Sequence, residues 1–61
     1  MMTLQWNHHA AGYIYASGSK GRYEIGDAFG VYSGMFMLDI RGKAAFFITM
    51  DDAKKFAQEM E

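Results

Sequence analysis

The feature that most constrains the fold of this chain is a change of hydrophobic period at Thr49. Before it, residues 35–40 alternate between two faces, and residues 44–48 resume an apolar run after the short segment 41–43. After it, the apolar residues recur at helical spacing. They are Met50, Ala53, Phe56, Ala57 and Met60. The C-terminal half therefore predicts a hairpin that leads directly into a helix.

The start of this helix is marked by capping chemistry. The Thr49 hydroxyl is placed to accept from the backbone N–H of Asp52, and Asp51 and Asp52 stand where the helix dipole favours negative charge. A helix over residues 49–60 has only about three turns and does not persist alone in water. We therefore expect its apolar stripe to pack on a sheet.

Glycines separate short runs of Tyr, Ile, Phe and Val in the first half of the chain, which is typical of turns between strands. Residues 13–16 and 22–25 flank the loop 17–21 and predict a hairpin. Residues 26–34 predict a loop with some strand character. The prediction is a single α+β domain over 1–61, in which a small antiparallel sheet of three to four strands precedes one C-terminal helix packed on one face. Residues 1–11 form an extended N-terminal segment, 12–48 a β-meander and 49–60 the helix.

One helix covers only one face of such a sheet. We assign to that covered face Tyr23, Ile25, Phe36, Leu38, Ile40, Phe46 and Ile48, facing Ala53, Phe56 and Met60. The opposite face then carries Met35, Met37 and Phe47, with Tyr13, Tyr15 or Tyr32. Soluble monomers rarely expose so contiguous an apolar patch. Three alternatives can cover this patch: the Trp6 segment with the 26–34 loop, a second copy of the chain, or a different protein.

Size and composition narrow the class of protein. A chain of 61 residues without cysteine has no disulfides, no thiol nucleophile and no Cys-ligated zinc site. A hydrophobic share of 51% and a net charge of −1 exclude intrinsic disorder. The N-terminus has neither a basic region nor a continuous apolar run, and no later run reaches the ~20 residues of a membrane span. We expect a soluble cytoplasmic protein.

The residues that carry chemistry are scattered. His8 and His9 are adjacent, so an extended backbone points them to opposite sides and no spaced third ligand completes a metal site. The carboxylates of Glu24, Asp27 and Asp39 predict no acid–base pair in a cleft. The serines stand beside glycines in predicted turns. We therefore predict no catalytic, metal-binding or cofactor-binding residue, and no enzyme activity.

Basic residues at the two predicted hairpin turns support an alternative function. They are Lys20, Arg22, Arg41 and Lys43. Two basic turns at one end of a sheet can enter a nucleic-acid groove. Against this stand the balanced net charge and the acidic residues of the helix, and basic residues at hairpin ends often protect sheet edges.

Three segments resemble small phage and prophage accessory proteins: GRYEI at 21–25, FMLDIRG at 36–42 and FITMDDAKKFA at 47–57. The resemblance covers about two-thirds of the chain and consists mostly of capping and hairpin residues. It implies a β-β-β-α fold and a phage-encoded, non-enzymatic protein that binds and modulates a host protein complex. Anti-CRISPR proteins, which act on CRISPR effectors, are similar in size and composition. The resemblance carries no catalytic residues.

The sequence thus predicts a small protein-binding module, with a homodimer as one arrangement. The residues expected to contact a host protein or complex are Met35, Met37, Phe47, Tyr13, Tyr15 and Trp6. The alternative is a nucleic-acid-binding protein that uses the basic turns. No membrane partner is expected.

Overall fold

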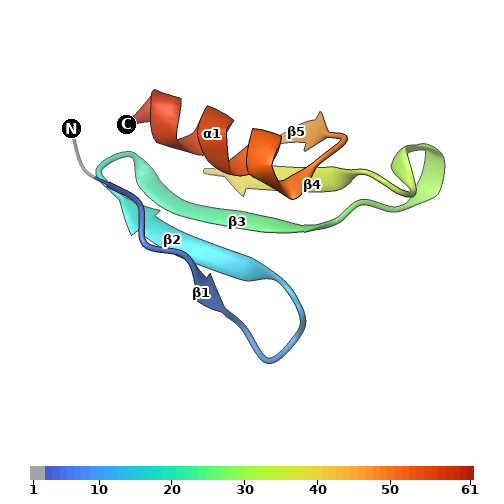
Figure 1. The fold of residues 1–61 in the computed structure, drawn as a ribbon, viewed down its shortest axis with the longest axis horizontal. Coiled ribbons are helices and arrows are strands. Elements are labelled where there is room, and N and C mark those ends of the chain that lie inside the picture. Colours follow the sequence, from blue (N-terminus) through green and yellow to red (C-terminus); the bar gives the residue numbers. More distant parts are fainter. Residues whose placement is uncertain (1–2) are drawn as a thin grey trace.

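The computed structural model of the chain describes residues 3–61 and contains a β-meander followed by one helix (Figure 1). The order along the sheet equals the order along the chain, and every neighbouring pair of strands is antiparallel. The elements are β1 (Asn7–His8), β2 (Ile14–Gly18), β3 (Gly21–Asp27), the 3₁₀ helix η1 (Gly30–Tyr32), β4 (Phe36–Ile40), β5 (Lys43–Phe47) and α1 (Met50–Met60). The α+β class, the antiparallel sheet and the C-terminal helix are confirmed.

The sheet has five strands in the described part of the chain, where the sequence predicted three or four. The additional strand is β1, whose Asn7 pairs with Tyr15 and whose His8 pairs with Ile14. It lies within the segment 1–11 that we expected to be extended, of which residues 1–2 lie outside the described residues. Two paired residues give almost no hydrophobic period, so β1 had no signal in the sequence.

The 26–34 segment contains the end of a strand followed by a loop with a short helix. β3 continues to Asp27, which pairs with Phe36, and η1 then carries the chain across the end of the sheet. Gly30 and Gly34 bracket this turn with φ of 70° and 94°, values that favour glycine. The loop that joins β3 to β4 is therefore shorter than predicted.

A tight turn sets the register of β5 and corrects the predicted faces. Arg41 and Gly42 both have positive φ (54° and 80°), as a two-residue hairpin turn requires, and Lys43 therefore pairs with Ile40. The pattern of residues 41–43 predicts a three-residue turn that includes Lys43. A shift of one residue moves every side chain of a strand to the other face. Phe47 consequently lies on the helix-covered face and Phe46 on the opposite one, the reverse of the prediction.

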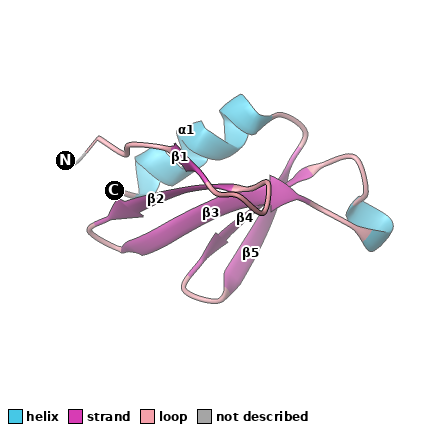
Figure 2. Ribbon diagram, turned by 90° about the horizontal axis from the view of Figure 1, so that it is seen from below, coloured by secondary structure: helices cyan, strands magenta, loops and turns pink. Residues whose placement is uncertain are grey.

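Helix α1 lies along the sheet on one face, as Figure 2 shows. The Thr49 side chain accepts a hydrogen bond from the backbone N–H of Asp52 at 3.1 Å, which confirms the predicted cap. Ala53 and Ala57 are fully buried against the strands, and their small side chains let the helix approach the sheet closely. Ile48, predicted from the sequence to lie in the core, is 77% exposed because it belongs to the connection between β5 and α1.

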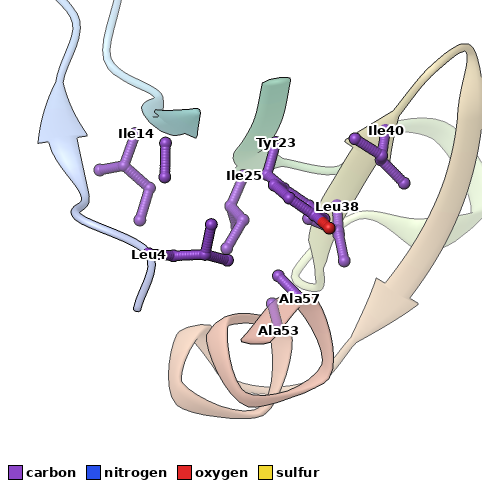
Figure 3. Close-up of a cluster of buried hydrophobic side chains, with 9 residues drawn as sticks. Leu4, Ile14, Tyr23, Ile25, Leu38, Ile40, Ala53 and Ala57 are labelled. Atoms are coloured by element: carbon purple, nitrogen blue, oxygen red, sulfur yellow. The ribbon is translucent and has the colours of Figure 1, made fainter. Parts of the chain in front are cut away.

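The core lies between α1 and the sheet (Figure 3). Its buried members are Leu4, Ile14, Ala16, Tyr23, Ile25, Leu38, Ile40, Ala53 and Ala57. Trp6, Phe36, Phe47 and Met50 are partly buried and pack against this cluster. Leu4 and Trp6, which precede β1, therefore fold onto the helix-covered side. They leave the opposite face of the sheet open.

Candidate protein-binding surface

The face of the sheet opposite α1 is the candidate site, and we call it the open face. In residues 3–61 no helix packs over it (Figure 2). Strand register places on it the side chains of Tyr15, Arg22, Glu24, Met37, Asp39, Ala44 and Phe46, with Tyr13 at the start of β2. The surface is thus aromatic and charged at once. Its tyrosines, phenylalanine, methionine and arginine are residue types enriched at protein interfaces, whereas its two carboxylates are of a type that interfaces hold mainly where a partner charge compensates them.

Stacking holds the aromatic groups near β2. The His9 ring lies 4.5 Å from the Tyr13 ring and nearly parallel to it, and the Arg22 guanidinium lies 4.2 Å above the Tyr15 ring. The backbone N–H of Ala11 donates to His9 Nδ1, which fixes the imidazole further. These contacts restrict the rings before any partner binds, so less conformational entropy is lost on binding.

A second stack stands at the other end of the open face. The Tyr32 ring from η1 lies 3.8 Å from the Phe46 ring of β5, with 6° between the ring planes. It anchors the loop that carries Phe29 and Val31, which are 79% and 94% exposed. Large apolar side chains this exposed extend the aromatic surface beyond the sheet.

Between these stacks the open face is hollowed by a cavity of about 370 Å³. Its lining residues are Ala11, Gly12, Tyr13, Glu24, Gly26, Asp27, Met37 and Asp39. Glu24 pairs directly with Asp39 across β3 and β4, and like charges in that position destabilise a sheet. Arg22 compensates Glu24 through an ion pair of 2.9 Å. Within residues 3–61 the Asp39 carboxylate has no hydrogen-bond or ion-pair partner.

The predicted contact residues divide between the two faces. Tyr13, Tyr15 and Met37 lie on the open face, as expected. Met35 precedes β4, is half-buried, and its carbonyl accepts from the Ala28 N–H at the edge of the loop. Trp6 and Phe47 pack against the core on the helix side, so the structure does not place them with the others.

Three of the four basic residues meet at one end of the molecule. Lys20, Arg41 and Lys43 line a cavity of about 640 Å³ together with Ile40 and Met60. Arg22 is not part of this group, because its guanidinium is engaged over the open face with Glu24 and Tyr15. The predicted meeting of the two basic turns is therefore observed, with three cations.

Sequence reasoning missed Glu61, whose side chain fastens the end of the helix to the β2–β3 turn. Its carboxylate accepts hydrogen bonds from the Ser19 N–H at 2.7 Å, the Ser19 hydroxyl at 2.9 Å, the Lys20 N–H at 3.3 Å and the Tyr23 hydroxyl at 2.7 Å. The partners lie 38 to 42 residues away in the sequence, and no local pattern signals such contacts.

This cluster shifts two ionisation equilibria in opposite directions. The hydrogen bonds from Ser19 and Tyr23 lower the pKa of Glu61 to about 2, because they stabilise the carboxylate. Burial, together with the hydrogen bond to Glu61, raises the pKa of Tyr23 to about 12. The cluster therefore keeps its charge distribution across the physiological pH range.

Neither a metal site nor a membrane-spanning helix is found among residues 3–61. In the described part of the chain no group of three His, Cys, Asp or Glu side chains is placed to bind a metal ion. Nor does any helix within residues 3–61 have the length and apolarity needed to cross a membrane.

Comparison with known proteins leaves the surface to be interpreted from its chemistry. The chain matches no protein-family model, and comparison with curated proteins and with solved structures gives no significant match. The resemblance to phage accessory proteins therefore stays a prediction.

Proposed function

We propose that the protein is a small, non-enzymatic binding module whose open face takes a protein partner that inserts a basic side chain. The observation that carries this proposal is the cavity lined by Glu24, Asp27 and Asp39 together with Tyr13 and Met37. A lysine or arginine places its apolar stem against rings and thioethers and its charge beside carboxylates. The cavity offers both in one place.

The charge arrangement supports a cationic partner specifically. The opposed pair of Glu24 and Asp39 costs stability in the free protein, and only Glu24 has a compensating arginine. A partner cation beside Asp39 relieves this repulsion, so the charge pair contributes to affinity and to the choice of partner. The restrained rings of Tyr13 and Tyr15 supply apolar contact around it.

The identity of the partner is the more specific part of the proposal. Resemblance to phage accessory proteins supports a host protein complex in the cytoplasm, such as a CRISPR effector, which the module inhibits or modulates. That part rests on the residues of the resemblance, whereas binding through the open face rests on its geometry. The proposal assigns no catalytic residue and no cofactor.

The test is affinity capture from a lysate of the source cell, with an N-terminal tag and three versions of the chain. We compare the unmodified protein, Asp39→Lys on the open face and Glu59→Lys on the exposed side of α1. Both variants change the net charge equally. We expect one defined protein to be retained by the unmodified chain and by Glu59→Lys, and lost with Asp39→Lys. Equal retention by all three, with native circular dichroism, would exclude the open face as the binding site.

A second candidate function rests on the cavity that Lys20, Arg41 and Lys43 line. Three clustered cations can bind a phosphate backbone, and such binding weakens steeply as salt increases. The capture experiment with and without nuclease separates the two functions. Nuclease-sensitive capture that is abolished by Arg41→Glu/Lys43→Glu would support nucleic-acid binding. Salt-independent capture would oppose it.

A further inference from the structure

β5 is a free edge of the sheet. The strand order ends at β5, and within residues 3–61 no segment pairs with its outer side. It is five residues long, Lys43-Ala-Ala-Phe-Phe47, and Ala44 is exposed. Natural sheets protect such edges with charge, proline, bulges or a covering segment. β5 carries one lysine and is otherwise apolar.

The hairpin turn determines which backbone groups this edge presents. In a hairpin closed by a two-residue turn, the pair next to the turn is hydrogen-bonded, and bonded pairs then alternate along the ladder. Lys43, Ala45 and Phe47 therefore bond to β4, as the partners of Ile40, Leu38 and Phe36. The N–H and C=O groups of Ala44 and Phe46 point outward, ready to pair with another strand.

An apolar groove runs beside the same edge on the helix side. Its volume is about 240 Å³, and its lining residues are Leu38, Ile40, Lys43, Ala44, Ala45, Phe56 and Met60. Phe56 and Met60 are 42% and 37% exposed although they belong to the apolar stripe of α1. The helix thus leaves its β5 side partly exposed, and a partner at this edge can supply both a strand and apolar side chains.

We propose that a second copy of the chain provides this cover, by antiparallel pairing of β5 with β5 so that Ala45 faces Ala45. The strand is self-complementary in this register. Ala44 meets Phe46 of the other copy, and Lys43 meets Phe47, so each large ring stands opposite a small or flexible side chain. The outward groups of Ala44 and Phe46 are the ones that bond, and identical patches related by a two-fold axis satisfy one another.

Charge also favours a second copy in this register. Lys43 lies beside Phe47 of the other copy, two residues before Thr49, which caps the helix whose first turn holds Asp51 and Asp52. Each end of the paired strands thus brings a lysine towards two carboxylates. A domain of this size has a small core, and oligomerisation is a common source of added stability. The pairing would also join the two open faces into one continuous surface.

Sedimentation equilibrium tests the pairing through one backbone donor. We compare the unmodified chain with Ala44→Pro, which removes the outward N–H, and with Ala44→Ser, which keeps it. The Ala44 N–H does not serve the β4 ladder, so the monomer fold should survive in both. We expect a dimer whose dissociation constant rises on the order of tenfold or more in Ala44→Pro, since two symmetric hydrogen bonds are lost, and stays near its original value in Ala44→Ser.

Cysteine cross-linking tests the register. The chain has no native cysteine, so Ala45→Cys and Ala44→Cys each introduce a single thiol. Residues directly opposite in a non-hydrogen-bonded pair are close enough for a disulfide, whereas residue 44 faces residue 46. We expect Ala45→Cys to form disulfide dimers on the order of a hundredfold faster than Ala44→Cys. Pairing of the strands holds the two thiols at residue 45 opposite each other, which raises their local concentration to the millimolar range.

The outcomes that overturn the proposal are distinct. A monomer at all accessible concentrations removes it. A dimer that is unaffected by Ala44→Pro, or one in which Ala44→Cys cross-links as fast as Ala45→Cys, places the contact on another surface and removes it equally. None of these results bears on Asp39, so the proposed binding function is tested separately.

Discussion

The two flanks of helix α1 are held in different ways. On the flank that faces β1 and β2, Gln58 Oε1 accepts from the Leu4 N–H at 2.8 Å, and Glu61 accepts from the β2–β3 turn. We call this the tied flank. On the flank that faces β5, the rings of Phe47 and Phe56 are in contact, with their centroids 5.2 Å apart. We call this the untied flank.

The difference shows how a small chain separates stability from interaction. Directional hydrogen bonds on the tied flank fix where the helix lies, and they use partners remote in sequence. The untied flank has apolar contacts without direction, and Phe56 remains partly exposed. Apolar contacts of that kind can be completed by another surface, whereas satisfied hydrogen bonds cannot. We therefore expect perturbations of the tied flank to reduce stability most.

The largest difference in the free energy of unfolding is expected between Leu4→Ala and Phe56→Ala. Leu4 is nearly fully buried on the tied flank, so its truncation should cost about 2–3 kcal/mol. Phe56 is partly exposed, and its loss should cost roughly 1 kcal/mol in the monomer despite the larger side chain. Urea denaturation of both variants at low protein concentration measures the two values. A greater loss for Phe56→Ala would reverse the assignment of the flanks.

Gly18→Ala should be the next most damaging change. A Cβ at this position would lie 2.5 Å from Glu61 Oε2 and 2.8 Å from Leu4 Cδ2, so two groups of the tied flank must move. Overpacking costs about 1–3 kcal/mol, and we expect the lower part of this range, about 1–2, because both contacted atoms are ends of flexible side chains. Thermal unfolding by circular dichroism measures it. The double variant Gly18→Ala/Glu61→Ala should recover part of the loss, and full additivity would contradict the proposed clash.

Thr49→Ala tests the helix end that lies on neither flank. The hydroxyl caps the Asp52 N–H at 3.1 Å, and loss of such a cap costs about 1 kcal/mol. Thr49→Ser keeps the acceptor and should remain near the stability of the unmodified chain. Chemical denaturation of the pair isolates the cap, and equal destabilisation of both would assign the effect to the threonine methyl group instead.

The smallest and most pH-dependent effect is expected at Glu61. Its folded-state pKa of about 2 lies below the ordinary value of 4.5, so its stabilisation is present above pH 4.5 and is lost as the pH falls towards 2. Tyr23 has a raised pKa of about 12, so its stabilisation is present below pH 10 and is lost between pH 10 and 12.

Denaturation midpoints across pH measure both dependences. Glu61→Gln should make the denaturation midpoint less dependent on pH in the acid range, and Tyr23→Phe should do the same in the alkaline range. Because the carboxylate is at the surface, solvent screening keeps the contribution below that of the cap. If the midpoint of Glu61→Gln falls with acid pH as steeply as that of the unmodified chain, other carboxylates determine acid unfolding.

The sequence was sufficient for features that depend on neighbouring residues. The alternation of residues 35–40 and the cap at Thr49 are local patterns, and the strand and helix appear where they indicate. The face of β5 was wrong because it depends on whether the turn contains two residues or three, and positive φ at Arg41, a non-glycine residue, is not evident from sequence.

The tied flank could not be predicted for a related reason. Leu4 is an isolated apolar residue, and Glu61 is an ordinary acidic residue at the end of a helix pattern. Leu4 acquires its role only when it packs beside the helix, and Glu61 only when the end of the helix meets the β2–β3 turn. Of the candidate site, Tyr13, Tyr15 and Met37 were correctly placed on the open face. The pairing of Asp39 with Glu24 required the register of the sheet.

The carboxylate of Glu61 also has a consequence for the lifetime of the folded state. Each strand pairs with its sequence neighbour, and such local topologies fold quickly. The bonds from Glu61 to Ser19 join residues 42 positions apart, so they should form after the meander has already assembled. Interactions absent from the transition state slow unfolding without speeding folding. The contribution of Glu61, although small, should therefore act on how long the native protein persists and not on how fast it forms.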